Sequence, residues 1–524
     1  MSLDLHPIDY AVLAVYFLIV IAIGVVVSRR IKTGDDLFLA GRRLGFAAIG
    51  FSLFASNISS TTLIGVTGQA YSTGISVANY EWMAGLLFLF MAFTTIPIFL
   101  RLRITTVPEY LERRFGPLSR KYFSALTIFL SVIVDTAGSV YAGVLVLQTF
   151  VPDLPFVTTC IVLATFAGLY TITGGLAAVV YTDILQAVVL LVGSTAIAIS
   201  VFAEFDFSFA LASANLPDGQ LSLIRPLDDP ALPWLGTLIG VPILGFYYWS
   251  TNQYIMQRVL GARDTDQARW GASLAGLLKI TPLFIMALPG AFAAGLIPDL
   301  ENGDMVFPVL TTNFLPIGLT GLVLAGLIAA IMSTIDSTLN SASTLILHDF
   351  VDVEGNKWDE QRIVRTGRLV TGILIVVAAL WPLVIRDFPG LFSYIQQVFS
   401  YAVPPVVAIF LLGMFWRQAT GKAAFLTLLF GHGLGLGIFA FRSMAGEADP
   451  LPHFTIVAGL STLICVLFCV LTSLMTGKTL EDRTASMWSP SDVAPNRPHP
   501  WFTDYRTHAF VVAILTLMTV IAFW

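Results

Sequence analysis

Long apolar runs recur along the whole 524-residue chain, and they constrain its fold more than any other feature. An α-helix rises about 1.5 Å per residue, so about 20 apolar residues cross the hydrocarbon core of a bilayer. The chain is 56% hydrophobic and 12% charged, whereas soluble domains carry about twice that charged fraction. The runs therefore predict an all-α membrane protein. We expect about fourteen transmembrane helices, near residues 9–27, 45–68, 77–100, 122–151, 155–174, 180–204, 233–256, 270–296, 314–347, 366–385, 389–415, 421–441, 454–475 and 507–524.

Basic residues fall almost entirely in alternate loops. Of the 28 lysines and arginines, 24 lie in or beside the loops that follow spans one, three, seven, nine, eleven and thirteen. Only Arg225, Arg386 and Arg442 lie in the opposite loops, and Lys279 lies inside a span. Cytoplasmic loops carry such an excess of basic residues. The pattern therefore predicts an even number of spans in the plasma (cytoplasmic) membrane, with both termini extracytoplasmic.

Charge and short motifs exclude several classes of function. The formal net charge is −5 and the basic residues act as orientation signals, so no nucleic-acid partner is expected. The chain contains neither a GxxxxGK[ST] loop nor a catalytic-triad pattern, so we expect neither an ATP-driven pump nor an enzyme. Its three cysteines lie in apolar runs without metal-ligand spacing. The expected partner is the lipid bilayer, and no obligate protein partner is evident.

The second predicted span contains a polar stretch, FASNISSTTLIG, at residues 54–65. Its side chains either bond back to carbonyls of the preceding helical turn, or mark a break in the helix at which a ligand binds. A charged group at mid-membrane costs about 2.5 to 3.5 kcal/mol or more, so other polar residues within spans are also candidates for a binding site. These are Glu81, Asp183, Lys279, Asp336, Asn340 and Gln396.

Four longer segments carry a resemblance to a known family. They are TITGGLAAVVYTDILQ (171–186), YYWSTNQYIMQRVL (247–260), DSTLNSASTLILHDF (336–350) and SYIQQVFSYAVPPVVAIFLLGMFW (393–416). Together they resemble the sodium/solute symporter family, and most of all its sodium/sugar cotransporter branch. The resemblance covers about residues 5–475, including the order and spacing of the spans.

The resemblance implies an inverted-repeat (5+5) transporter core with discontinuous helices and a substrate site near the midplane. Residues 45–415 would form this core. Residues 1–44 would form an N-terminal accessory helix and a cytoplasmic loop. Residues 416–524 would form C-terminal accessory helices, with a cytoplasmic linker at 477–506.

A sodium site follows from the same resemblance. In the family, the first helix of the repeat unwinds at the polar stretch, so the main-chain carbonyls of Ala55 and Ile58 would face a sodium ion. The ninth span would add the Ala330 carbonyl and the hydroxyls of Ser333 and Thr334. Such neutral oxygens suit a hard, singly charged cation that must also leave. Na+ is the expected co-transported ion.

The resemblance also places substrate-binding residues. A polyol has many hydroxyls that both donate and accept hydrogen bonds, so a site that mixes amide, carboxylate and ammonium groups can satisfy them. Glu81 and Lys279 can also neutralise one another. Thr62 stands where sugar cotransporters often carry His or Gln, which leaves the particular sugar or cyclitol open. The expected substrate-binding residues are Asn57, Thr62, Glu81, Tyr248, Trp249, Lys279 and Gln396.

A second cation site is expected near two acids. Asp183 falls where two-sodium family members place an acidic residue, and Asp336 and Ser337 lie on the helix that would face it. Either this pair of acids holds a second sodium, or one of them is kept protonated by burial and by its neighbour's charge. As a third possibility, Asp183 simply caps its own helix.

The expected function is sodium-coupled secondary active symport of a neutral polyhydroxylated solute. A monosaccharide such as glucose or galactose is the first expectation. The alternatives are symport of inositol or another small solute, and a solute-gated sensor or channel on the same scaffold.

Overall fold

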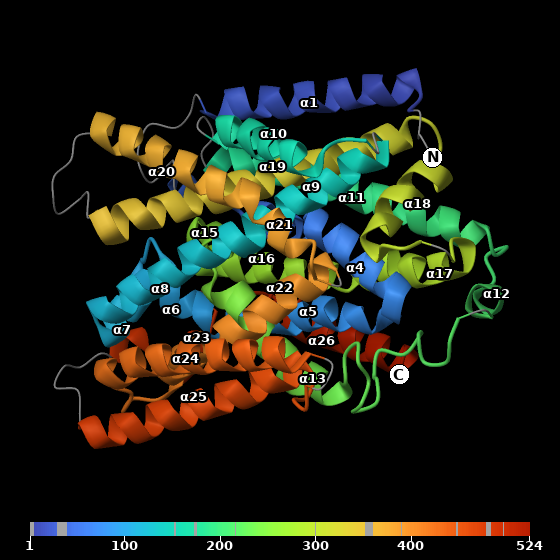
Figure 1. Ribbon diagram of the computed structural model, residues 1–524. Helices are drawn as coiled ribbons and strands as arrows, with labels where there is room; N and C mark the ends of the chain where they lie inside the picture. Colours follow the sequence, from blue (N-terminus) through green and yellow to red (C-terminus); the bar gives the residue numbers. More distant parts are fainter. Residues whose placement is uncertain are drawn as a thin grey trace.

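The chain forms a bundle in which most of the long helices run roughly along one direction (Figure 1). The computed structural model describes residues 5–28, 39–150, 153–171, 176–214, 216–298, 300–351, 360–388, 390–446, 449–477, 484–495 and 497–524. In chain order the α-helices are α1 (Pro7–Ser28), α3 (Phe46–Asn57), α4 (Ser60–Thr73), α5 (Asn79–Phe93), α6 (Thr95–Leu102), α7 (Val107–Phe115), α8 (Pro117–Leu130), α9 (Ala137–Phe150), α10 (Phe156–Thr171), α11 (Leu176–Ala203), α12 (Phe209–Ser213), α13 (Trp234–Ile239), α14 (Val241–Phe246), α15 (Gln253–Leu260), α16 (Thr265–Leu278), α17 (Leu288–Leu296), α18 (Val306–Phe314), α19 (Leu319–Leu345), α20 (Glu360–Leu380), α21 (Pro382–Ile385), α22 (Leu391–Ala402), α23 (Pro404–Phe415), α24 (Gly421–Ala445), α25 (Phe454–Thr476) and α26 (Tyr505–Ala522).

The lengths of the apolar helices confirm a multi-spanning membrane protein. Eight described helices are long and apolar enough to cross a bilayer, and the number is ten if each of two bent helix pairs forms one span. Shorter apolar helices cover residues 7–23, 156–165 and 369–385. The expected total of fourteen spans therefore stays a prediction.

Several of the predicted spans are interrupted, and the interruptions in the second, seventh and eleventh spans position the site. In the second span, α3 and α4 meet at a bend of 54°. In the eleventh span, α22 and α23 meet at a bend of 56°. The seventh span is divided among α13, α14, a π-helical segment and α15. Spans two and seven are five spans apart, as expected for the first helices of two five-helix units.

The broken helix α3–α4 lies in the interior of the bundle. α3 packs against α16 and α11, while α4 packs against α17 and α22. Small residues allow the close approach of α3 and α16, because a Cβ on Gly50 would lie 2.9 Å from Leu274 Cβ and one on Gly271 2.8 Å from Ile49 Cβ. The polar stretch is therefore surrounded by protein rather than by lipid.

Peripheral helices surround this interior. α1 packs along α19 and α11, and α26 packs along α16 and α5. α24 and α25 pack against each other and against α23. These outer helices expose large apolar side chains, including Leu18 on α1 at 65% and Phe510 on α26 at 65%, as expected for surfaces that face lipid. α1 begins and α26 ends at the same end of the bundle (Figure 1).

Candidate functional site

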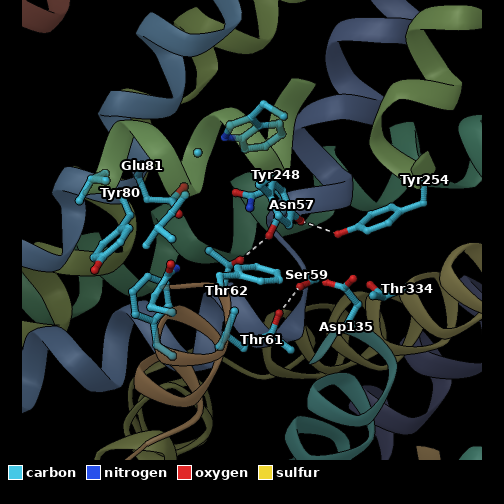
Figure 2. Close-up of a pocket in the computed structure, with 18 residues that line it drawn as sticks. Asn57, Ser59, Thr61, Thr62, Tyr80, Glu81, Asp135, Tyr248, Tyr254 and Thr334 are labelled. Atoms are coloured by element: carbon cyan, nitrogen blue, oxygen red, sulfur yellow. Dashed lines mark hydrogen bonds between the residues drawn. The ribbon is translucent and has the colours of Figure 1, made fainter. Parts of the chain in front are cut away.

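A pocket opens beside the break between α3 and α4, in the interior of the bundle (Figure 2). Its walls come from the broken helix and from α5, α14, α15, α19 and α22, together with two π-helical segments, η3 (Ser131–Thr136) and η4 (Tyr247–Thr251). Short π-helical segments often occur at functional sites. The polar and aromatic residues that line it are Asn57, Ser59, Thr61, Thr62, Tyr80, Glu81, Asp135, Tyr248, Trp249, Tyr254, Thr334, Phe392, Gln396 and Phe399.

At the polar stretch the helix is interrupted, and hydroxyl groups beside the interruption bond back to main-chain carbonyls. α3 ends at Asn57, and Ser59 is extended, with φ −81° and ψ 175°. The Thr62 hydroxyl donates to the carbonyl of Asn57, and the Ser56 hydroxyl donates to that of Ser52. The break and the bonding back to carbonyls, which the sequence presents as alternatives, therefore occur together.

The end of α3 contains the two residues whose main-chain carbonyls are the expected sodium ligands. The last turn of a helix has carbonyls without intrahelical partners, and Ala55 belongs to that turn while Ile58 follows it directly. Both residues are buried, at 5% and 1% exposure. This is the place at which the sequence predicts two carbonyl ligands for sodium.

On one side of the pocket, three helices are joined by one ammonium group. Lys279, at the end of α16, donates from Nζ to Oδ1 of Asn57 on α3 and to Oε2 of Glu81 on α5. Lys279 is fully buried and Glu81 is 4% exposed. The expected Glu81–Lys279 pair is thus present, and it neutralises two charges that would otherwise be costly in a low-dielectric interior. The ammonium also lies 5.3 Å from the ring centroid of Trp249, which adds a cation–π contact.

Aromatic residues of the seventh span close another side. Tyr248 and Trp249 lie in η4, with their ring centroids 4.8 Å apart. The hydroxyls of Tyr248 and Tyr254 are 2.6 Å apart, which links η4 to α15 across the interruption (Figure 2). Gln396 lines the pocket from α22. All seven expected substrate residues therefore lie at this pocket or, in the case of Lys279, bond directly to residues that line it.

On the opposite side, α19 presents hydroxyls toward the break. Thr334 lines the pocket, and its hydroxyl donates to the carbonyl of Ala330 at 2.9 Å. The hydroxyl of Ser333 donates to Oδ1 of Asp183 at 2.9 Å. The three expected sodium ligands on α19, Ala330, Ser333 and Thr334, therefore lie within about one helical turn. Ser333 also contacts Asp183 of the expected second cation site.

The surroundings of Asp183 correct part of the sequence analysis. Asp183 accepts from Arg258 at 3.0 Å and from the Ser52 hydroxyl at 2.8 Å, and both charged side chains are 2% exposed. Arg258, which the hydropathy pattern places in a cytoplasmic loop, supplies a counter-charge to Asp183, so Asp183 is balanced without a mobile cation or a proton. A signal was available, because Arg258 falls within one of the four motifs, YYWSTNQYIMQRVL.

The other expectations for the second cation site concern a capping role for Asp183 and the positions of Ser337 and Asp336. Asp183 lies inside α11, seven residues beyond its first residue, Leu176, so the proposal that it caps its own helix is wrong. The hydroxyl of Ser337 is buried and has no hydrogen-bond partner among the described residues. Asp336 belongs to α19, and its side chain lies outside the described part of the structure.

Sequence reasoning also missed a pocket residue, Asp135. It lies in η3, between α8 and α9, and lines the pocket opposite Glu81. The signal was present, because Asp135 is a carboxylate within the fourth predicted span, where ionisable residues are rare and functional. Tyr254 was missed as well, although it also falls within the YYWSTNQYIMQRVL motif.

Comparison with solved structures identifies the fold. A Na+-coupled sialic acid symporter, solved in a substrate-bound outward-open state, aligns with a TM-score of 0.76 and 24% identity, over 91% of this chain and 99% of that one. Mhp1, a nucleobase-cation-symport-1 family transporter in a closed conformation with bromovinylhydantoin bound, aligns with a TM-score of 0.54 and 14% identity, over 87% and 99%. The architecture is therefore that of the inverted-repeat transporters with discontinuous helices, as the sequence predicts.

Sequence comparison identifies the family. The chain is 33% identical to human (Homo sapiens) sodium/glucose cotransporter 4, over 90% of this chain and 76% of that protein. It is 36% identical to rabbit (Oryctolagus cuniculus) sodium/myo-inositol cotransporter 2, over 82% and 70%. The profile of the sodium:solute symporter family matches residues 37–431. This chain belongs to the sodium:solute symporter family: it is a multi-pass membrane transporter that couples solute movement to sodium and not an enzyme.

Proposed function

We propose that the solute is a neutral polyol, namely a monosaccharide such as glucose or galactose, or an inositol. One observation carries the proposal: an ammonium, an amide and a carboxylate converge on one side of a buried pocket through Lys279, Asn57 and Glu81. Together they offer both donors and acceptors without a net charge, which matches the hydroxyls of a neutral polyol. Relatives named for glucose and for myo-inositol support the same class of solute.

Specificity would follow from the bonds that the solute replaces. Solute hydroxyls would take over donors and acceptors that the Lys279 cluster now uses internally. A solute without hydroxyls would separate these groups without replacing their bonds, and a site built to bond hydroxyls rejects such analogues strongly. Tyr248 and Trp249 would bound the ring, and Thr62 and Gln396 would complete the polar lining.

Coupling would depend on the break in span two. A sodium ion held by the carbonyls of Ala55, Ile58 and Ala330 and the hydroxyls of Ser333 and Thr334 would bridge α3 and α19. The ion would therefore favour the conformation in which these helices are close. Because Asn57 lies between the two carbonyls of α3, the ion would also fix a residue of the solute site. This shared helix is the physical basis for reciprocal coupling.

A second cation site at Asp183, Asp336 and Ser337 also belongs to the proposal, with one modification. Arg258 already balances Asp183, so a second sodium would have to compete with this guanidinium. Ser333 would contact both sites, because its hydroxyl now donates to Asp183. One or two sodium ions per solute are both compatible with this arrangement.

We also propose the membrane placement that the sequence predicts. Residues 45–415 would form the transport core, residues 1–44 and 416–524 the accessory segments, and residues 477–506 a cytoplasmic linker. The basic loops would face the cytoplasm, so both termini would be extracytoplasmic in the plasma membrane.

A solute panel in proteoliposomes tests this function. Glucose, galactose, myo-inositol and, as a non-polyol control, proline would be offered under an inward sodium gradient and under an equal potassium gradient. We expect accumulation of at least one polyol above its external concentration with sodium only. Accumulation of proline instead would contradict the polyol proposal, and equilibration without accumulation would indicate a channel or sensor.

A further inference from the structure

Asp135 is the acid lining the pocket that the proposed solute and sodium contacts do not use. The other two buried acids of this region have basic partners: Glu81 bonds Lys279, and Asp183 bonds Arg258. Oδ2 of Asp135 is buried and has no hydrogen-bond partner among the described residues. Burial of an ionised carboxylate without a counter-charge is costly, so Asp135 is neutralised either by a proton or by a cation that enters the pocket.

The position of Asp135 points to the ion side of the pocket. Figure 2 shows its carboxylate between Ser59, at the break of span two, and the hydroxyl of Thr334 on α19. The side chains of Asn252 and Tyr254 hydrogen-bond the Asp135 carboxylate. These neighbours contribute hydroxyl and amide groups, and the nearby guanidinium of Arg258 is already bonded to Asp183.

The backbone around Asp135 is tied to the same helices. The hydroxyls of Thr136 and Thr338 are 2.8 Å apart, and Thr338 in turn donates to the carbonyl of Thr334 at 2.7 Å. The hydroxyl of Tyr394 on α22 donates to the carbonyl of Ile133 at 2.7 Å. The π-helical segment η3 is therefore held against α19 and α22, which fixes the position of the Asp135 backbone beside the pocket.

We propose that Asp135 supplies the negative charge that balances the transported sodium ion in this pocket. The inference rests on the proposed function, in which the solute is neutral and sodium is the mobile cation. The five sodium ligands expected from the sequence are all neutral oxygens, so they provide coordination but no counter-charge. A carboxylate in the same cavity would strengthen sodium binding even without direct contact, since charges interact strongly where water is excluded.

Equilibrium binding of radioactive sodium to the purified full-length chain, without any solute, tests the proposal. Asp135→Asn preserves the shape and the hydrogen-bonding ability of the side chain but removes its charge. We expect its sodium dissociation constant to rise about tenfold or more, because a buried counter-charge is lost. We expect Asp135→Glu, which restores the charge, to recover most of the affinity. Asp9→Asn, which removes a buried carboxylate outside the pocket, serves as the matched control and should bind sodium like the wild type.

The outcomes separate this inference from the proposed function. If wild type binds sodium and Asp135→Asn binds it equally well, Asp135 is not the counter-charge, although the sodium site stands. If solute KM at saturating sodium rises in Asp135→Asn while sodium affinity is unchanged, Asp135 is instead an acceptor for a solute hydroxyl, and the inference is overturned. If wild type itself binds no sodium, the proposed sodium site fails together with the inference. Asp135→Ser, smaller and also neutral, gives the same test if the Asn variant does not fold.

Discussion

The two sides of the pocket each depend on a buried ion pair, but they place it differently. On the solute side, Glu81 lines the pocket itself and bonds Lys279 directly. On the ion side, neutral hydroxyls approach the pocket, and the pair Asp183–Arg258 lies behind them. A solute must therefore exchange its hydroxyls against a charged cluster, whereas the expected sodium ligands are neutral oxygens and the proposed counter-charge is Asp135. The difference predicts that loss of a charged member of either ion pair lowers stability as well as binding, whereas loss of a neutral side chain alters only the affinity for the ligand on its own side.

The largest effect is expected from Lys279. Lys279→Met leaves Glu81 buried without a counter-charge, which should destabilise the protein by about 3 to 5 kcal/mol. Thermal unfolding of the purified protein would measure the loss, and uptake should be abolished. The double variant Lys279→Met with Glu81→Gln should recover stability but not uptake. If the single variant unfolds like wild type, the pair does not stabilise the solute side.

The next largest effect is expected from Asp183, because its partner, Arg258, lies behind the ion site. Asp183→Asn leaves Arg258 without its counter-charge, although Asn still accepts a hydrogen bond, so we expect destabilisation of about 3 kcal/mol. Reversal potentials of solute-coupled current at several sodium and proton gradients would then give the ion stoichiometry. If a second sodium binds here, the variant should carry one sodium fewer per solute. An unchanged ratio, independent of pH, would restrict Asp183 to a structural role.

Gln396 is an uncharged residue with which the solute side of the pocket can be tested. Gln396→Ala should leave one solute hydroxyl unpaired and weaken solute affinity by about 1 to 3 kcal/mol, with little effect on stability. Uptake kinetics at saturating sodium would measure this change. An equal loss of sodium affinity in the absence of solute would contradict the division of the pocket into two sides.

The smallest effects are expected from the hydroxyls of α19. Ser333→Ala and Thr334→Ala each remove one neutral ligand, so the sodium concentration for half-maximal uptake should rise about fivefold, equivalent to about 1 kcal/mol. Thr462→Ala, on α25 and outside the pocket lining, is the matched control because its buried hydroxyl bonds the backbone of its own helix in the same way. Wild-type sodium dependence in both ligand variants would show that sodium binds elsewhere.

The helical, multi-spanning character was predictable, since apolar length depends on local sequence alone. The inverted-repeat core and the break at Asn57 were predictable only through the family resemblance, because the polar side chains by themselves left bonding back to the helix as an alternative. The partners of the buried charges were less predictable: Arg258 reaches Asp183 across 75 positions, and a loop assignment based on hydropathy hides such a contact. Asp135 was missed for a similar reason, because one acid in a long apolar run hardly changes its mean hydropathy, and only the folded chain shows that it lies beside Thr334.

The central claim is that sodium and a polyol bind to one coupled site on the broken second span. Solute affinity measured at several sodium concentrations, and sodium affinity measured at several solute concentrations, test it directly. Linkage requires both affinities to change by the same factor, and we expect sodium to tighten solute binding and solute to tighten sodium binding equally in wild type. Affinities for the two ligands that do not depend on each other would contradict the account.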